Sequence, residues 1–282
     1  MLEPRMLAAT GLAIAVAVFG AIDSIIVRVL TESLHPFTIV FFRGLFGLLF
    51  IAPWVLRDPT VLVTHYRFLH LFRAALKMLS LVAFFIAISM AALSDVTAIA
   101  FTTPVFLTLG AWFFLREKPV LVRVLAVLIS FIGVLVVLRP GQSALNSPLL
   151  WALAGAILTA AIQLILKIMS KNDSTEALVS WNLIAMLPIS AVPLIWFWTK
   201  PDTYQLVLLA AQGSLGAINM GCMAKALSMA QASYLAPFEF LRLPVVALLA
   251  YLLFAEVPYP TTFAGGGIIF ISTLLLVRTV NR

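Results

Sequence analysis

Ten long apolar runs follow one another along the chain, separated by short polar connections. The runs occupy residues 6–30, 36–56, 68–92, 96–115, 120–138, 148–169, 177–198, 204–230, 234–254 and 261–277. Each run is long enough to cross about 30 Å of hydrocarbon as a helix. The sequence therefore predicts an all-α integral membrane protein with ten transmembrane helices.

The composition excludes a soluble globular fold. Apolar residues make up 63% of the 282 residues and charged residues 10%, against roughly half and a quarter in soluble domains. The net charge of +7 does not indicate nucleic-acid binding, because the lysines and arginines are spread through the connections between the apolar runs. That distribution is typical of membrane topology signals.

The sequence lacks the patterns that catalytic or metal centres require. The single cysteine, Cys222, lies inside an apolar run and cannot form an intramolecular disulfide. The histidines, His35, His65 and His70, do not have the spacing of a metal site, and no phosphate-binding glycine loop occurs. We therefore expect no enzymatic activity, no cofactor and no metal.

Basic residues near the ends of the runs predict the orientation of the chain. If the N-terminus is cytoplasmic, nine of these residues lie on the cytoplasmic side and three on the other side. The cytoplasmic set is Arg5, Arg57, Arg67, Arg116, Lys118, Lys167, Lys171, Arg278 and Arg282, and the opposite set is Arg28, Arg139 and Lys200. Cytoplasmic connections carry the excess of lysine and arginine in membrane proteins, so both termini are expected in the cytoplasm.

The two halves of the chain repeat one another. A shift of 139 residues brings a glutamate, a proline and an arginine onto residues of the same type; the pairs are Glu117 and Glu256, Pro119 and Pro258, and Arg139 and Arg278. Each half holds five runs, an odd number, so the second half is upside down in the bilayer. We expect a first five-helix repeat at residues 1–142 and a second, inverted repeat at 143–282. Inverted repeats are typical of secondary transporters, with the substrate site near the membrane midplane.

Three sets of residues point to a known family. They are His35-Pro36 followed by Arg43, the segment 98–104 followed by Leu115-Arg116-Glu117, and Gly133-Val134-Leu135, with a weaker copy in the segment 236–244 and Glu256. The chain thereby resembles the drug/metabolite transporter superfamily, specifically its EamA-type ten-helix members. It departs from the family at Phe19-Gly20, where Trp-Gly is common, and at Asn182, which stands where the first half has Arg43.

The resemblance implies a secondary transporter with a central cavity lined by the first, third, fourth, sixth, eighth and ninth helices. We expect the chain in a bacterial inner (plasma) membrane, with a small-molecule substrate and the lipid bilayer as its partners. Proton coupling and uncoupled transport both stay open, and the sequence does not specify an oligomeric state.

Asp23 and Arg43 are predicted to lie at similar depth. Asp23 lies seven residues before the end of the first run, and Arg43 lies seven residues after the start of the second. A short connection joins these runs, so the two helices are expected to be antiparallel neighbours. The residues form either a structural ion pair, which spares two buried charges, or a proton or cation site at Asp23.

Lys77 is the first candidate for binding substrate. It lies about eleven residues into the third run, too deep for its ammonium group to reach the interface easily. Ser80 shares its helix face. We expect Lys77 to line the cavity and to bind a carboxylate or phosphate of the substrate. Its counterpart in the second half is Gly216, so the binding site is asymmetric.

The ninth run supplies a second set of candidates. Glu239 and Arg242 are three residues apart, so they can form a pair on one helix face, and Pro237 and Pro244 flank them. The fourth run carries Pro104 at a nearly matching position. Prolines kink helices and free backbone carbonyls, and kinks at matching positions in two repeats indicate the binding region. A pair that only locks helix packing is the alternative.

Two uncharged polar residues complete the candidate site. Gln163 and Asn219 lie in the sixth and eighth runs, where each can hydrogen-bond a substrate or join two helices.

The predicted function is transport of small metabolites by alternating access, with export of amino acids as the expected activity. A cavity that contains Lys77, Glu239 and Arg242 suits a zwitterion. The alternative substrates are anionic solutes such as sugar phosphates or nucleotide sugars. A channel and an intramembrane enzyme are the alternatives outside carrier transport, and the enzyme is disfavoured because the runs hold no nucleophile–base or metal cluster.

The inverted topology can be tested with impermeant thiol reagents. Single cysteines in the changes Gln142→Cys and Asp202→Cys should react from outside, whereas those in Asp58→Cys and Asn172→Cys should react only from the cytoplasm. Labelling of positions 58 and 142 from the same side would contradict the inverted repeat.

Overall fold

The computed structural model contains helices and no strand in the residues that it describes, which are 4–114, 121–138, 147–169, 172–229, 238 and 241–280. The longer elements of the first half are α1 (Pro4–Leu30), α2 (Pro36–Arg57), α3 (Arg67–Met90), α4 (Leu93–Ala100), α5 (Thr103–Phe114) and α6 (Leu121–Leu138), with a short 3-10 helix η1 (Pro59–Leu62) after α2. Those of the second half are α7 (Ser147–Met169), α8 (Thr175–Ala191), α9 (Leu194–Phe197), α10 (Thr203–Met229), α12 (Arg242–Phe254) and α13 (Pro260–Val280). The all-α class is as predicted.

Six stretches are long and apolar enough to cross a membrane as helices. They are Met6–Leu30, Pro36–Arg57, Arg67–Met90, Leu93–Phe114, Pro148–Leu166 and Thr203–Met223. Four shorter apolar helical stretches accompany them, at Val127–Val137, Glu176–Ala191, Arg242–Phe254 and Pro260–Ser272. All ten coincide with apolar runs of the sequence, and six of them have the length of a membrane span. The count of ten transmembrane helices therefore stays a prediction.

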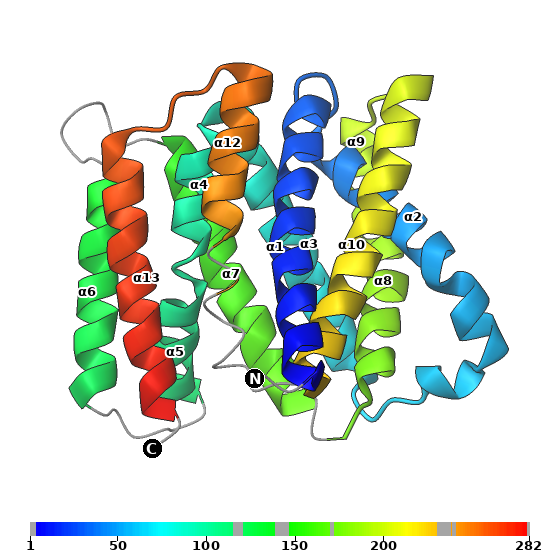
Figure 1. The fold of residues 1–282 in the computed structure, drawn as a ribbon. Helices are drawn as coiled ribbons and strands as arrows, with labels where there is room; N and C mark the ends of the chain where they lie inside the picture. Colours follow the sequence, from blue (N-terminus) through cyan, green and yellow to red (C-terminus); the bar gives the residue numbers. More distant parts are fainter. Residues whose placement is uncertain are drawn as a thin grey trace.

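The helices form a bundle whose two ends can be told apart in Figure 1. Helix α1 begins and helix α13 ends at the lower end of the bundle as drawn, and the turn from α1 to α2 lies at the upper end. The Arg28 side chain, near the end of α1, donates to the carbonyl groups of Ile88 and Ala91, so the end of α3 lies beside the end of α1. Helix α7 ends beside the start of α3, because Asp173 contacts Thr64. Helices α1 and α7 therefore run in opposite directions.

Helices and contacts recur with the shift of 139 residues. The shift places α1 on α7, α2 on α8 and α9, α3 on α10, α5 on α12 and α6 on α13. The contacts between the halves come in matching pairs: α1 packs on α10 as α7 packs on α3, α2 on α10 as α8 on α3, and α12 on α1 as α5 on α7. Helices α6 and α13, which correspond to each other, also pack together. This pattern is typical of two equivalent units related by a two-fold axis.

Local sequence signals recur at equivalent positions. His35 is the N-cap of α2, where its ring nitrogen Nδ1 accepts from the backbone N–H of Phe37, and its counterpart Ser174 is the N-cap of α8, where the hydroxyl accepts from Ala177. Capping side chains satisfy backbone donors that a helix start leaves free. The two helices therefore begin for the same reason at matching places.

Small residues let the first helix of each half pack closely. Ala13, Ala17 and Ala21 form a stripe on α1, and each has at most 4% of its surface exposed. Their counterparts on α7 are Ala152, Ala156 and Ala160, which are equally buried. Lipid tails are as apolar as leucine side chains, so association in a membrane depends on such close backbone approach.

Two apolar runs that were predicted as single helices are interrupted. The run 96–115 is divided between α4 and α5 at Phe101 and Thr102, directly before Thr103 and Pro104. Proline has no N–H and disfavours helical backbone in the residue before it. The hydroxyls of Thr102 and Thr103 donate to the carbonyls of Ile99 and Ala100, which compensates for the lost backbone bonds. Pro104 thus marks a break in the helix path, where a kink was predicted.

The prolines of the second half have different outcomes. The run 177–198 is divided between α8 and α9 at Val192 and Pro193. Pro244 lies in the first turn of α12. Backbone N–H groups there have no partner within the helix, so proline removes no helical hydrogen bond. Pro237 lies outside the described residues, so its predicted kink stays a prediction.

Helices α6 and α13 touch through their backbones. A Cβ atom on Gly265 would lie 2.6 Å from the carbonyl oxygen of Gly133 and 2.5 Å from Cγ2 of Val137. A Cβ atom on Gly267, two residues along the same helix, would meet no atom within 4 Å. Glycine is therefore required at position 265 by packing and is free to change at position 267.

This difference predicts the effect of two matched substitutions. Gly265→Ala should lower the melting temperature of the detergent-solubilised protein, because overpacking costs about 1–3 kcal/mol. Gly267→Ala should leave the melting temperature unchanged or raise it, since alanine is the better helix former. Equal melting temperatures for the two variants would show that α6 and α13 do not pack as described.

Candidate functional site

An ion pair joins α1 to α2 in the interior of the bundle. The Nη1 atom of Arg43 lies 2.5 Å from Oδ1 of Asp23, and 18% and 17% of the two side chains are exposed. The guanidinium group also covers Gly216 of α10, where a Cβ atom would come within 2.9 Å of Nη2. The structure thus brings together the two residues that were expected to pair. Whether the pair is structural or also binds a coupling proton stays open.

Lys77 lies near the middle of α3 and is half-buried. Asp23, Arg43, Arg73 and Arg242 are all within electrostatic range of its ammonium group. Within the described part of the chain the ammonium group has no hydrogen-bond or ion-pair partner. Of the four charged side chains that act on the ammonium group of Lys77, one is acidic and three are basic, so its surroundings are mainly positive.

Arg242 extends the charged region to the second half. It begins α12, its Nη2 atom donates to the hydroxyl of Ser24 at 2.7 Å, and its guanidinium group packs against Gly20. Arg242 therefore reaches α1 from the opposite repeat. Its predicted partner Glu239 lies outside the described residues, so that pair stays a prediction.

Two buried polar side chains on α3 join helices. The hydroxyl of Ser80 donates to the carbonyl of Gly155 at 3.1 Å and lies 2.8 Å from the hydroxyl of Thr159. Arg73 donates to the carbonyl of Leu178. Ser80 was predicted to line the cavity, but here its bonds are used in packing α3 on α7. Gln163, also predicted for the site, is exposed on α7.

A polar face on α10 corresponds to the face of α3 that carries Lys77. Gln212, Gly216 and Asn219 are the counterparts of Arg73, Lys77 and Ser80. Among the described residues, the buried Oδ1 of Asn219 and both amide atoms of the fully buried Gln212 have no hydrogen-bond partner. Buried polar atoms are normally satisfied, so this face has free capacity for water or a ligand. Asn219 was predicted from the sequence, whereas Gln212 was not.

A cluster at the lower end was missed by the sequence analysis. The Asp173 side chain is fully buried in the turn between α7 and α8. It accepts from the hydroxyl of Thr64 at 2.5 Å and from the backbone N–H of His65 at 3.0 Å, and it lies 2.9 Å from Nε2 of His70. We call these four residues the Asp173 clamp. Asp173 is more than 100 residues from the other three, and no sequence signal had indicated their contact.

The hydrogen bonds of the clamp keep Asp173 ionised. Burial alone would raise the pKa of this carboxyl group, because desolvation disfavours the charged form. The bonds from Thr64, His65 and His70 outweigh burial, so the pKa of Asp173 lies below its ordinary value. At the upper end burial lowers the pKa of His35, whose ring stacks on those of Phe37 and Phe197 in a cluster of three rings.

A second charged cluster lies at the upper end. Arg28 lies 2.9 Å from Oε1 of Glu256, and Oε2 of Glu256 accepts from the backbone N–H of Leu93 at the start of α4. A carboxylate at a helix N-terminus satisfies a free donor and interacts favourably with the helix dipole. The cluster connects α1, α4 and the loop between α12 and α13. The repeat had indicated Glu256 as a matching position but not this contact.

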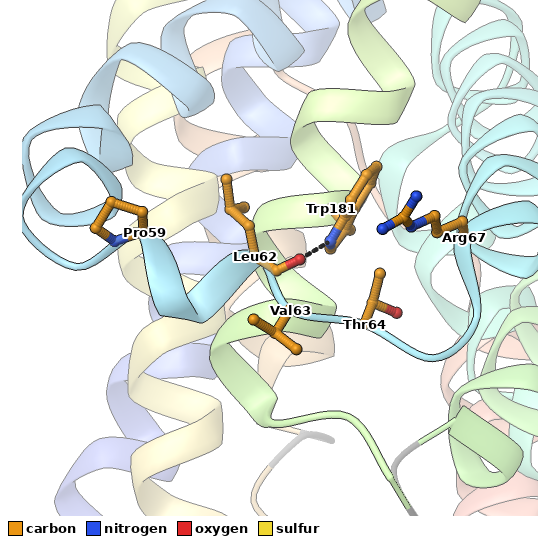
Figure 2. Close-up of a pocket in the computed structure, with 6 residues that line it drawn as sticks. All are labelled: Pro59, Leu62, Val63, Thr64, Arg67 and Trp181. Carbon is orange, nitrogen blue, oxygen red and sulfur yellow. Dashed lines mark hydrogen bonds between the residues drawn. The ribbon is translucent and has the colours of Figure 1, made fainter.

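A hollow of about 420 Å³ opens at the lower end (Figure 2). It is lined by Pro59, Leu62, Val63, Thr64, Arg67 and Trp181. The indole N–H of Trp181 donates to the carbonyl of Leu62 at 2.9 Å, which joins α8 to the end of η1. None of the residues predicted to bind substrate lines this hollow, so it is distinct from the predicted site.

Six helices that are long and apolar enough to cross a membrane indicate an integral membrane protein. The EamA-like transporter family matches the chain twice, over residues 7–139 and again over residues 146–278. The chain belongs to the EamA-like transporter family, a group of the drug/metabolite transporter superfamily, and it is a transporter of small molecules.

Three relatives illustrate the range of the family. An S-adenosylmethionine uptake transporter of Rickettsia bellii is 28% identical over 94% of this chain and 91% of its own length. A riboflavin transporter of Vibrio cholerae is 31% identical over 64% of this chain and 61% of its own length. The pseudopaline exporter CntI of Pseudomonas aeruginosa is 26% identical over 90% of both chains. A solved crystal structure with 17% identity covers both chains completely with a TM-score of 0.64, so it shares the fold.

The pairing of Asp23 with Arg43 predicts non-additive effects on stability. Asp23→Asn and Arg43→Gln should each lower the melting temperature, because each leaves a buried charge without its partner, at a cost of about 3–5 kcal/mol in the most buried cases. The double variant should be more stable than the worse single variant. A double-mutant cycle measured by thermal unfolding in detergent checks this, and additive losses would refute the pairing.

Proposed function

We propose that the chain is a secondary transporter that moves a small metabolite bearing an α-amino-acid group across a bacterial inner membrane by alternating access. The observation that carries the proposal is Lys77, a half-buried ammonium group near the middle of α3 without a described partner. A charge at this depth needs water, a counter-charge or a substrate. A substrate carboxylate would supply that counter-charge.

The comparison of the two halves supports an anion beside Lys77. In the second half the counterpart of Lys77 is Gly216. The guanidinium group of Arg43 lies over Gly216 and forms an ion pair with Asp23. The shift of 139 residues replaces Arg43 by Asn182 and Asp23 by Ile162. The fold therefore provides no equivalent acid for Lys77, and we assign that place to the substrate.

The relatives support a substrate of this kind. S-adenosylmethionine, named for the relative in Rickettsia bellii, carries an α-amino group and an α-carboxylate on its methionine part. In the proposal Lys77 binds the carboxylate, and the unpartnered amide groups of Gln212 and Asn219 are available to polar groups of the substrate. The amino group of the substrate is assigned to Glu239, as predicted from the sequence.

Alternating access is supported by the repeated architecture. We propose two inverted five-helix repeats at residues 1–142 and 143–282, ten transmembrane helices and two cytoplasmic termini. The family match over two successive segments and the matching helix contacts support this division. Two equivalent units that pack around a central site can exchange their conformations, and the site then opens to opposite sides in turn.

The excess of basic groups favours a second class of substrate. Three basic side chains, Arg43, Arg73 and Arg242, and one acid, Asp23, act on Lys77, and a site of this charge also suits sugar phosphates or nucleotide sugars. Competition in one transport assay separates the two classes. An amino acid and S-adenosylmethionine should compete with each other, and a sugar phosphate should not compete with them.

Direction and coupling are decided by the same assay. The sequence analysis favours export, and relatives are named for uptake as well as for export. Proteoliposomes loaded with labelled substrate on one side, with and without a pH gradient, separate export from uptake and proton-coupled from uncoupled transport.

Lys77→Met tests the proposed site directly. The variant should fold with an unchanged melting temperature, and its affinity for a carboxylate-bearing substrate should fall about tenfold to a hundredfold, since a hydrogen bond to a charged group is worth about 1.5–3 kcal/mol. Binding and transport of S-adenosylmethionine and an amino-acid panel in proteoliposomes provide the measurement.

The matched control is Lys225→Met, the same substitution at an exposed lysine of α10. It should leave affinity and transport unchanged. Unchanged affinity and full transport in Lys77→Met would remove Lys77 from the site, and loss of folding would favour a structural role.

A further inference from the structure

Equivalent backbone elements meet at the two ends of the bundle. At the lower end the turn between α7 and α8 meets the segment that enters α3, where Asn172 donates to the hydroxyl of Tyr66 at 2.6 Å. At the upper end the turn between α1 and α2 meets the segment that enters α10, where Gln205 donates to the hydroxyl of Ser33 at 2.8 Å. The shift of 139 residues places each of these contacts on the other, so the same two elements meet at both ends.

The chemistry at the centre of these contacts differs between the ends. Asp173 and His70 lie 2.9 Å apart at the lower end, and both side chains are fully buried. Their counterparts at the upper end are Leu34 and Leu209, which are 3% and 0% exposed and belong to one hydrophobic cluster. The lower end thus has a hydrogen-bonded pair of polar side chains at the two positions where the upper end has leucines.

We propose that the Asp173 clamp is a one-sided fastening between the two halves, which biases the carrier toward the state that is closed at the lower end. The clamp joins Thr64, His65 and His70 of the first half to Asp173 of the second, across the boundary between the two family matches. The fastening itself follows from these contacts. Its effect on the conformational equilibrium rests on the proposed alternating access.

The physical basis is the difference between the two closing contacts. If both ends closed through the same interactions, the states closed at either end would be equally stable. A difference between the ends shifts their populations by the corresponding free energy. Separating the halves at the lower end removes three donors from a buried carboxylate, and a buried charge without donors is strongly unfavourable until water reaches it. Separating two leucines breaks no hydrogen bond.

A double-mutant cycle tests the fastening without any transport measurement. His70→Leu and Asp173→Leu should each lower the melting temperature, because each leaves a buried polar partner behind. The double variant reproduces the leucine pair of the upper end and should be more stable than either single variant. Additive losses in the cycle would overturn the clamp as a coupled unit.

Distance measurements between spin labels test the conformational bias. In a Cys222→Ser background, labels at the exposed positions 57 and 176 report on the lower end, and labels at the exposed positions 32 and 204 report on the upper end. In the His70→Leu, Asp173→Leu double variant the population with a long lower-end distance should rise at least severalfold, and that with a short upper-end distance should rise with it. Unchanged distance distributions in this folded variant would overturn the proposal.

A matched variant at the upper end should act in the opposite direction. The buried hydroxyl of Thr38 donates to the carbonyl of Phe197, joining the two halves at that end. Thr38→Val removes this bond at nearly constant volume and should shift the labels toward the state closed at the lower end. A shift in the same direction as in the clamp variant would contradict the proposal.

The same samples separate failure of the clamp from failure of the proposed function. Absence of transport in the parent protein, with label populations that respond as expected, would reject the carrier and support the fastening. Transport in the parent with unresponsive labels would reject the bias and leave the carrier in place.

Discussion

Hydrocarbon offers polar groups no hydrogen-bond partners, and the whole structure depends on this constraint. Every backbone amide and every charge at membrane depth must be satisfied by the protein, by water in a cavity or by a bound solute. The helices meet the requirement for the backbone, and the hydroxyls of Thr102 and Thr103 meet it where the path breaks between α4 and α5. Arg43 meets it with Asp23, and Arg242 donates to Ser24. Lys77, which has no such partner among the described residues, is therefore the informative exception.

Much of the fold could be predicted because hydrophobicity and length alone determine where a chain can enter a bilayer. The run 36–56 became Pro36–Arg57, and the run 6–30 became Pro4–Leu30. The runs 96–115 and 177–198 each contain an interruption that the sequence did not predict, although residues 93–114 together still have the length of one membrane span. Average hydrophobicity contains no information on backbone conformation. A run therefore looks like one continuous helix although Pro104 or Pro193 interrupts it.

The candidate site could be predicted only in part, since a single residue type does not specify its neighbours. Asp23 and Arg43 could be paired because a short connection fixes the relative position of two successive helices. Asp173 and His70 are separated by 103 residues, and no local pattern predicts that a turn after α7 meets the start of α3. Ser80 shows a further limit, because a polar residue on an apolar helix can serve packing as well as binding, and only its neighbours decide between the two.

The similarity of the halves organises the fold, and their differences carry the chemistry. The alanine stripes of α1 and α7 and the N-caps of α2 and α8 are shared. The charges are not shared: with the shift of 139 residues, Lys77 corresponds to Gly216, Asp173 to Leu34 and Asp23 to Ile162. A symmetric frame can thus hold an asymmetric interior, because packing uses small and apolar residues while the charged positions vary independently.

The guanidinium group of Arg43 over Gly216 has a consequence for the ancestry of such a chain. An assembly of two identical first halves would place a lysine at the position of Gly216, directly against the guanidinium group of the other copy. Two like charges in that space would repel each other without water to screen them. The two halves are therefore no longer interchangeable modules. Glycine at position 216 leaves room for the guanidinium group of Arg43, so the first half fits the second half and does not fit a copy of itself.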